Sequence, residues 1–319
     1  MMSAPTRSPV TQQSGSTSPY AAAEIADQPS AWARAATLAG EERTRQALPR
    51  VGERVAVVGC GTSFFMGQSF AIHREESGHG ETDVFPASEF PRGRSYDAVV
   101  VLTRSGTTTE VLRLLQHLNS GGPRPRTVVI TADPATPVMQ LTDHQVVLDF
   151  ADERSVVQTR FATTSVALWR AWLGEDLDNL ISEASAALVE PRPARALTST
   201  QFTFLGAGAS VGIANEAALK VREASQSWAE SYPAMEFRHG PISVIDRSST
   251  VWLFGETPPG LMDDLQVTGG HVMSSDRDPL ADLIRAQRLA VALAEVKGLN
   301  PDTPRNLTRS VLLAGADRP

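Results

Sequence analysis

Short apolar runs that end in glycine or hydroxyl residues, each followed by a helix-like stretch, recur along the chain. ERVAVVGCG (53–61) is followed by FFMGQSFAIHREE, and YDAVVVLTRSG (96–106) is followed by TTTEVLRLLQHL. Two more runs and two helical stretches come next: RTVVITADP (126–134), HQVVLDF (144–150), FATTSVALWRAWL (161–173) and 176–189. Strands that alternate with helices predict an α/β fold with a parallel sheet covered on both faces.

The pattern begins again in the second half of the chain. The segment VEPRPARALTST has the composition of a linker, and QFTFLGAG (201–208) then opens a second strand–glycine–helix unit. This predicts two similar α/β lobes, over residues 19–190 and 191–319, with the second lobe shorter. Residues 1–18 are rich in Ser, Thr and Pro without an apolar segment, so we expect a disordered tail and no signal peptide.

Charge and cysteine content exclude several classes of protein. The 319 residues carry a net charge of −7, which argues against a general electrostatic grip on nucleic acid or on an anionic membrane. The single cysteine, Cys60, excludes an internal disulfide framework. No apolar run approaches the roughly 20 residues that span a bilayer. We therefore expect a cytoplasmic protein without nucleic-acid or membrane partners.

Three loops at predicted strand-to-helix junctions could bind a ligand. GCGTS (59–63) has small residues that let backbone N–H groups approach a ligand, and TRSGTTTE (103–110) carries five hydroxyls and one Arg. An N-cap would explain one of those hydroxyls but not the cluster, so a phosphate site is favoured at the carboxyl end of the strand. The third loop, SVVQTRFATT (155–164), offers Gln158, Thr159 and Arg160, although Arg160 could equally lie on the surface. The motifs of nucleotide-binding loops, GxxxxGK[ST] and GxGxxG after a strand, are not found.

The stretch EAALKVRE (216–223) places three charged residues on one face of a helix, Glu216, Lys220 and Glu223. Such a stripe is commonly a solvated surface. His239 follows the helix, on a turn between Arg238 and Gly240–Pro241 that must be kinked. Together Glu223 and His239 supply a carboxylate and an imidazole, the usual pair for moving protons on carbon and oxygen.

Six segments together carry a family resemblance: GCGTS, ASEF (87–90), RSGTTTEVL, FATT, EAALKVREASQSWAESYPAMEFRHGPISVID (216–246) and the PRNL of PRNLTRSV (304–311). On them the chain resembles the sugar isomerase (SIS) family, most closely the isomerase half of glucosamine-6-phosphate synthase, without its N-terminal glutaminase domain. The resemblance implies two SIS-type lobes, each a parallel sheet flanked by helices, and a hexosamine 6-phosphate as the small-molecule partner. It implies neither a cofactor nor a metal.

The resemblance also implies roles for individual residues. The sugar 6-phosphate would be held by Ser63, Thr103, Ser105 and Thr108, with Arg104 as an added charge partner. Glu223 would move the proton between C1 and C2. His239 would open the sugar ring and would reach into the site of a neighbouring subunit, which predicts a homodimer with a shared active site. The sugar itself would be lined by Glu216, Lys220, Val156 and Gln158.

Three positions depart from the synthase pattern. Arg104 stands in place of a glutamine, Gln158 replaces a small serine, and Arg309 replaces the tail lysine that forms an imine with the sugar. Arginine stays protonated, so Arg309 cannot form that imine. The region after Ile245 is also shorter than in the synthase.

These departures favour one reaction and leave two alternatives open. The leading hypothesis is a dehydratase that eliminates the C3 hydroxyl of N-acetylglucosamine 6-phosphate or an epimer after C2 deprotonation. Arg309 would stabilise the enolate in this reaction, and Gln158 would hold the acetamide, although Arg309 could instead pair with a carboxylate. The alternatives are an amino-sugar-6-phosphate deaminase or aldose–ketose isomerase, and a non-catalytic sugar-phosphate-binding regulator.

Overall fold

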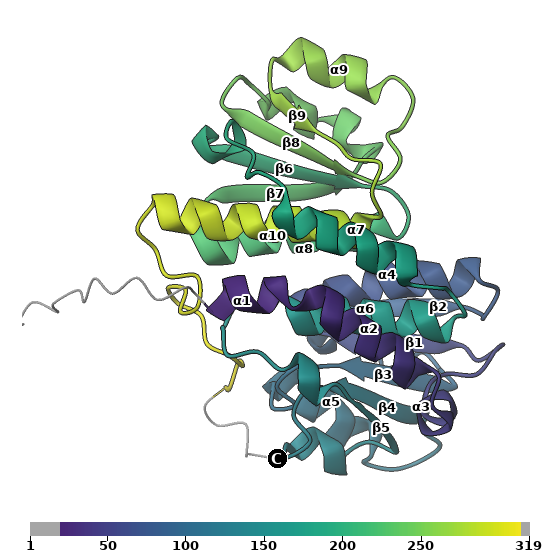
Figure 1. Ribbon diagram of the computed structural model, residues 1–319. Helices are drawn as coiled ribbons and strands as arrows, with labels where there is room; N and C mark the ends of the chain where they lie inside the picture. Colours follow the sequence, from purple (N-terminus) through teal and green to yellow (C-terminus); the bar gives the residue numbers. More distant parts are fainter. Residues whose placement is uncertain (1–19, 314–319) are drawn as a thin grey trace, which may run out of the picture.

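Helices and strands alternate through most of the chain in the computed structural model, which describes residues 20–313 (Figure 1). The tail expected over residues 1–18 lies outside the described residues. The helices are α1 (Tyr20–Ala26), α2 (Gln28–Ala39), α3 (Glu42–Ala47), α4 (Thr62–Glu76), α5 (Thr109–Leu118), α6 (Arg160–Trp172), α7 (Asp178–Val189), α8 (Ser210–Ser225), α9 (Leu261–Thr268) and α10 (Pro279–Val296). The short 3-10 turns are η1 (Ala87–Glu89), η2 (Pro137–Gln140), η3 (Asp149–Ala151), η4 (Ala196–Thr198), η5 (Glu236–His239) and η6 (Pro241–Val244).

Nine described strands form two fully parallel sheets. The strands are β1 (Val55–Gly59), β2 (Thr82–Pro86), β3 (Ala98–Leu102), β4 (Arg126–Thr131), β5 (His144–Val147), β6 (Gln201–Gly206), β7 (Trp228–Pro233), β8 (Ser249–Phe254) and β9 (His271–Met273). The first sheet has the order β2-β1-β3-β4-β5 and the second β7-β6-β8-β9, so the second repeats the plan of the first with one strand fewer. The predicted α/β fold with two parallel sheets, the second smaller, is confirmed.

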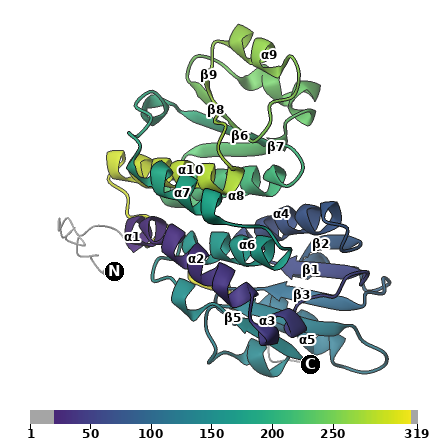
Figure 2. The same ribbon diagram turned by 45° about the vertical axis from the view of Figure 1, so that its right-hand side comes forward.

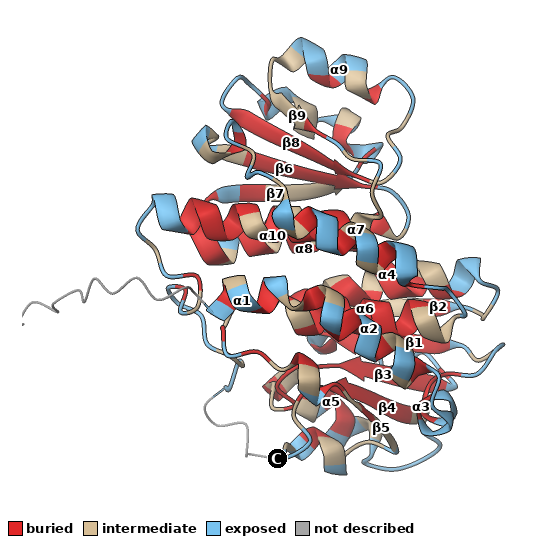
Figure 3. Cartoon of the chain, in the orientation of Figure 1, coloured by how far each residue is buried: buried red, intermediate tan, exposed pale blue. Residues whose placement is uncertain are grey.

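Both faces of each sheet are buried, which explains the continuous apolar runs in the sequence. In β1, Val55 and Val57 face the central core, whereas Ala56 and Val58 face the core under α5. Helix α9 covers the outer face of the second sheet in the same way. Two layers of helices, α8 with α10 and α4 with α6, lie between the sheets (Figures 1 and 2). The central strands β1, β3, β4, β6 and β8 are accordingly among the most buried segments (Figure 3).

The two lobes meet where helix α4 crosses helix α8. At Gly212 the helices approach backbone to backbone, because a Cβ added there would lie 2.3 Å from the carbonyl oxygen of Phe65 and 2.9 Å from the amide nitrogen of Ser69. Asn215 of α8 also donates a hydrogen bond of 2.7 Å to Gln68 of α4. The central core contains strand residues of both sheets, such as Val57 and Phe204. The proposed lobe boundary at 190/191 falls in the connection between α7 and β6 and stays a prediction.

Arg74, near the end of α4, is a fully buried arginine that holds loops together from the inside. Its Nη1 donates to the carbonyl oxygens of Gly80 and Glu81 and to the hydroxyl of Thr82. Its Nη2 donates to the carbonyl oxygens of three further residues, Arg50, Glu53 and His79. One guanidinium thus joins the segment before β1 to the turn before β2.

Strand β2 and helices α1–α3 were not predicted from the sequence. β2 lies at the edge of its sheet and is mostly half-buried, so it lacks the continuous apolar run of a central strand. Among residues 20–313, none of the helices combines the length and the apolar character of a membrane-spanning segment.

Candidate functional site

The candidate site lies where strands β1 and β3 end side by side. In the order β2-β1-β3-β4-β5, the chain leaves β1 and β3 toward opposite faces of the sheet. Helix α4, after β1, packs on the central face, and helix α5, after β3, packs on the outer face. A crevice outside the carboxyl ends of the strands at such a switch point is where open α/β sheets bind ligands. The loops GCGTS and TRSGTTTE both lie at this edge.

Hydroxyl groups gather at the end of β3, in a set that we call the hydroxyl cluster: Ser105, Thr107, Thr108 and Ser310. The Oγ of Ser310 lies 3.2 Å from that of Ser105, 3.0 Å from Oγ1 of Thr107 and 3.4 Å from Oγ1 of Thr108. Of the residues expected to hold the phosphate, Ser105 and Thr108 are therefore brought together. Ser63 and Thr103 are buried at the ends of β1 and β3. Thr107 and Ser310 were not among the residues expected from the sequence.

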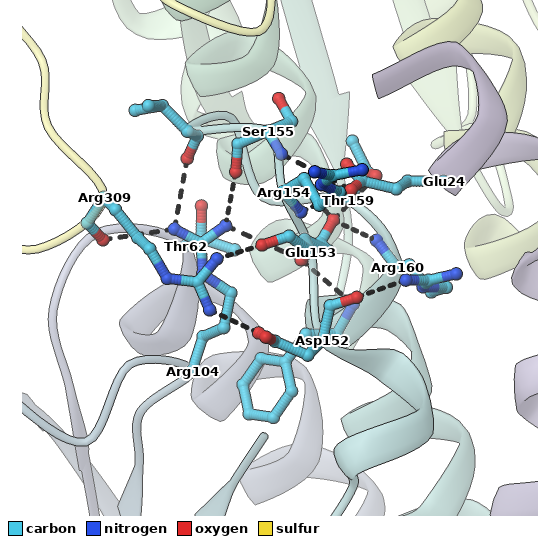
Figure 4. Close-up of polar contacts among 12 residues, drawn as sticks. Glu24, Thr62, Arg104, Asp152, Glu153, Arg154, Ser155, Thr159, Arg160 and Arg309 are labelled. Carbon is cyan, nitrogen blue, oxygen red and sulfur yellow. Dashed lines mark hydrogen bonds and ion pairs between the residues drawn. The ribbon is translucent and has the colours of Figure 1, made fainter. Parts of the chain in front are cut away.

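Arg104 does not point toward the hydroxyl cluster, so its expected role as a charge partner of the phosphate is corrected. Its guanidinium is buried and donates to the carbonyl oxygens of Ser155 (3.0 Å), Val156 (3.3 Å) and Arg309 (3.1 Å) (Figure 4). Glu153 provides a counter-charge at 3.8 Å. Burial lowers the pKa of Arg104, and the Glu153 carboxylate opposes that shift. Arg104 thus joins the TRSGTTTE loop to the third loop and to the C-terminal tail.

Two carboxylates that the sequence analysis missed hold the third loop. Glu24 of α1 accepts hydrogen bonds from the backbone N–H groups of Arg154 (2.6 Å) and Ser155 (3.3 Å). Glu153 accepts from the first N–H groups of α6, at Thr159 (2.6 Å), Arg160 (2.8 Å) and Phe161 (3.2 Å), where the helix dipole favours a negative charge. An acidic residue just before a predicted helix start could have signalled Glu153, whereas the partners of Glu24 lie too far along the chain to be read from the sequence.

The side chains of the third loop are engaged in the structure or buried. Arg160 is half-buried and pairs with Asp27 at 2.7 Å, so it is neither free for a ligand nor a solvated surface residue. Val156 donates its backbone N–H to the carbonyl oxygen of Asp302 at 3.0 Å, and this contact ties the loop to the tail. The Oε1 of Gln158 is buried and has no hydrogen-bond partner among residues 20–313.

The Arg309 guanidinium is engaged by protein groups, so its expected role at the enolate is also corrected. Its guanidinium binds the carboxylate of Asp152 and the carbonyl oxygen of Glu153 (Figure 4). A guanidinium that is engaged by a carboxylate and a carbonyl holds the tail and is not free to bind a sugar. In the structure Arg309 pairs with the Asp152 carboxylate, in agreement with the alternative stated for it.

The three charged residues of α8, which we call the charged triad (Glu216, Lys220 and Glu223), form a buried site and not a solvated stripe. Lys220 Nζ lies 2.5 Å from Glu223 Oε2, 3.3 Å from Glu216 Oε1 and 3.0 Å from Thr62 Oγ1. The side chains of Glu216 and Lys220 are 0% and 1% exposed, whereas that of Glu223 is 20% exposed. Thr62 belongs to the GCGTS loop, so the triad lies at the same edge of the first sheet as the hydroxyl cluster. Glu223 is the member that a ligand can reach.

Burial also sets the protonation of the triad. Desolvation raises the pKa of Glu216 to about 8, against the attraction of Lys220 and with a further rise from the Glu223 charge. The pKa of Lys220 is raised, because the two carboxylates outweigh the desolvation that lowers it. With Glu216 protonated, the positive charge of Lys220 is balanced by one carboxylate, that of Glu223.

The raised pKa of Glu216 predicts a pH-dependent stability. The folded state keeps a proton on Glu216 that the unfolded state releases near pH 4.5. The stabilising contribution of the protonated Glu216 is therefore fully present below pH 4.5 and is lost as the pH rises through about 8. Glu216→Gln, which is neutral throughout, should remove this part of the pH dependence. Urea unfolding between pH 5 and 9 measures it, with Glu256→Gln on the surface as the control. Parallel pH profiles for wild type and Glu216→Gln would contradict the assignment.

His239 lies far from Glu223 within one chain. Helix α8 runs back against β6, so Glu223 in its last turn lies near the amino end of β7, whereas His239 follows the carboxyl end of β7. The six residues of β7 span on the order of 20 Å. His239 is exposed at the end of η5, and the expected kink is present because Gly240 has a φ of 138°. One chain therefore does not bring the two groups together.

Comparison with known proteins identifies the fold and finds a SIS domain within the chain. Residues 50–170 match the family model described as SIS domain. The chain is similar to the glutamine–fructose-6-phosphate aminotransferase (isomerizing) of Sulfurisphaera tokodaii, 26% identical over 81% of this chain and 50% of that protein. The corresponding protein of Thermus thermophilus is 27% identical over 92% of this chain and 58% of its own length. The chain thus spans about half the length of these curated relatives.

Solved structures share the fold across nearly their whole length. A glucosamine-6-phosphate deaminase from Thermotoga maritima has a TM-score of 0.76 at 22% identity, covering 92% of this chain and 100% of that one. The C-terminal domain of glucosamine-fructose-6-phosphate aminotransferase from Francisella tularensis has a TM-score of 0.80 at 20% identity, covering 90% and 99%. The tagatose-6-phosphate ketose/aldose isomerase of Escherichia coli has a TM-score of 0.75 at 21% identity, covering 92% and 97%.

Proposed function

The chain is a SIS-domain protein, with that domain over residues 50–170, and from this premise we propose that it is an enzyme acting on an amino sugar 6-phosphate. The observation that carries the proposal is Glu223. It is a partly exposed carboxylate, held 2.5 Å from the ammonium of Lys220, at the sheet edge where the hydroxyl cluster lies. A fixed carboxylate at the same end of the sheet as a set of hydroxyl donors suits proton transfer on a phosphorylated sugar.

The proposed first step is removal of the C2 proton from the open-chain aldehyde by Glu223. The electron pair of the C–H bond then moves toward the C1 carbonyl and gives an enolic intermediate. Return of the proton to C1 completes an aldose-to-ketose isomerisation. If C2 carries a free amine, the same transfer gives a ketimine, which water hydrolyses to a ketose phosphate and ammonia.

Isomerisation or deamination is the better supported outcome. The names of the structural neighbours, a glucosamine-6-phosphate deaminase and a ketose/aldose isomerase, both describe reactions of this kind. Neither outcome needs a lysine that forms an imine. That agrees with the charged triad, in which Lys220 is held as an ammonium by the Glu223 carboxylate.

Dehydration of an N-acetylated substrate is the second candidate. One observation favours it: the buried Oε1 of Gln158 has no donor among the described residues and could accept a hydrogen bond from an acetamido N–H. After Glu223 takes the C2 proton, a C2=C3 double bond would form as the C3 hydroxyl leaves with a proton as water. Arg309 has no role in this version, because its guanidinium binds Asp152.

A panel of hexosamine 6-phosphates, free and N-acetylated, tests these proposals by mass spectrometry. A ketose phosphate with release of ammonia from a free-amine substrate supports deamination, and an isomer of unchanged mass supports isomerisation. Loss of 18 mass units, the mass of water, from an N-acetylated substrate identifies the dehydratase. Binding without any turnover or C2 deuterium exchange in D₂O would leave the non-catalytic regulator as the explanation.

The opposite positions of Glu223 and His239 along β7 support a homodimer in which each site takes its histidine from the partner. Glu223→Ala and His239→Ala homodimers should both be inactive. When the two variants are mixed so that subunits exchange, about half of the dimers become heterodimers. In each heterodimer, one of the two sites has both Glu223 and His239. Activity per active site should therefore return to at most about a quarter of the wild-type value. Heterodimers isolated with two affinity tags and found inactive would contradict a shared site.

A further inference from the structure

The last described residues of the chain lie against the hydroxyl cluster. Ser310 Oγ lies 3.0–3.4 Å from the hydroxyl oxygens of Ser105, Thr107 and Thr108, so it stands among groups that come from a loop about 200 positions earlier. A fourth hydroxyl in this position could not be anticipated from the loop sequence alone.

The tail is fastened on both sides of Ser310. Before it, the carbonyl oxygen of Arg309 accepts from Arg104 at 3.1 Å, and the Arg309 guanidinium binds Asp152. After it, the carbonyl oxygen of Val311 accepts from the backbone N–H of Thr109 at 3.2 Å, and the N–H of Leu313 donates to Thr109 Oγ1 at 3.0 Å. The position of the Ser310 side chain is therefore set by bonds that do not involve its own hydroxyl.

The chemistry of the cluster suits a phosphate group. Each of the four hydroxyls carries one proton, and their described contacts are largely with one another. A phosphate oxygen has only acceptor sites, so each hydroxyl can turn its proton toward it in a charge-assisted bond. The cluster also adjoins the first turn of α5, a ten-residue helix whose dipole favours an anion.

We propose that Ser310 is a direct ligand of the substrate phosphate, carried to the site by the C-terminal tail. The phosphate site is then composite, with three hydroxyls from the loop after β3 and one from the end of the chain. Arg104 and Asp152 act as positioning residues, because they hold the backbone and side chain of Arg309. This inference rests on the proposed function, since it assumes that a sugar phosphate binds at this loop.

Calorimetric titration with glucosamine 6-phosphate tests the proposal, with unphosphorylated glucosamine as the contrasting probe. Ser310→Ala should raise the Kd for the phosphorylated probe by roughly ten- to a hundredfold, the loss expected for one charge-assisted bond. Ser310→Thr, which keeps a hydroxyl, should stay within about threefold of wild type. Ser310→Glu should abolish binding by placing a carboxylate in the cluster.

Thr308→Ala is the matched control, because that exposed hydroxyl lies in the same tail but donates to the backbone carbonyl of Ser310 and not to the cluster. Ser105→Ala separates this inference from the proposed function. Weakened binding in Ser105→Ala together with wild-type affinity in Ser310→Ala would overturn the role of Ser310 and leave the proposed function standing. Unchanged affinity in both variants, or equal affinity of the wild type for the unphosphorylated sugar, would overturn both.

Discussion

Glu223→Gln is expected to lower kcat on the amino sugar phosphate by about 10²–10⁴-fold, the range for loss of a general base. The amide has nearly the shape of the carboxylate and can still accept a hydrogen bond from Lys220, which lies 2.5 Å from Glu223 in the native protein. It cannot take a proton from carbon. Substrate affinity should therefore change far less than kcat, and exchange of the C2 hydrogen with D₂O should stop together with turnover.

Two further variants make the result for Glu223 specific. Glu223→Asp keeps a carboxylate on a shorter side chain and should retain partial exchange. Glu256→Gln, a change of the same type at an exposed position, should leave kcat unaltered. Exchange in Glu223→Gln within about twofold of wild type would remove Glu223 as the base, whichever product is formed.

Arg74→Leu is expected to cost about 1–3 kcal/mol in the free energy of unfolding, the range for buried acceptors that lose their donor. Five carbonyl oxygens and the Thr82 hydroxyl accept from the Arg74 guanidinium. Leucine would remove the one described donor to the carbonyl oxygen of Glu53. The other four carbonyl oxygens would each lose one of two described donors, and every lost bond to a partly buried acceptor carries a cost. Urea denaturation should show a lower midpoint.

Arg74→Lys should also be destabilising. An ammonium group has only three donors, and it cannot bridge the acceptors before β1 and those before β2 as the planar guanidinium does. The matched control is Arg113→Leu, the same change at an exposed position of α5. A loss below about 1 kcal/mol for Arg74→Leu, comparable with that of Arg113→Leu, would show that water or side-chain rearrangement satisfies the carbonyls.

The sequence allowed the fold to be predicted where burial imposes a strong pattern. Central strands such as β1 and β3 are buried on both faces and so appear as continuous apolar runs. The half-buried edge strand β2 lacks that pattern and was missed. The positions of the loops followed from the rule that ligands bind at the carboxyl ends of parallel strands. The hydroxyl groups of Ser105 and Thr108 both lie within 3.4 Å of Ser310 Oγ, and their binding of a phosphate stays a prediction.

The side-chain directions at the site could not be predicted in the same way. Arg104 lies between two residues expected at the phosphate, yet its acceptors on Ser155 and Arg309 are 51 and 205 positions away. A buried guanidinium needs several acceptors, and only the tertiary structure supplies them here. The same holds for Arg309, whose partner Asp152 is 157 positions away. The Lys-to-Arg departure was recognised in the sequence, but its physical role depends on that distant carboxylate.

The common core between the lobes has a consequence for how the molecule unfolds. Residues of both sheets, among them Val57 and Phe204, belong to one apolar cluster, and helices α4 and α8 touch through their backbones at Gly212. Parting the lobes would expose that cluster to water, at a cost that grows with the apolar area uncovered. The two lobes are therefore expected to unfold together, as a single cooperative unit, and not as two independent domains.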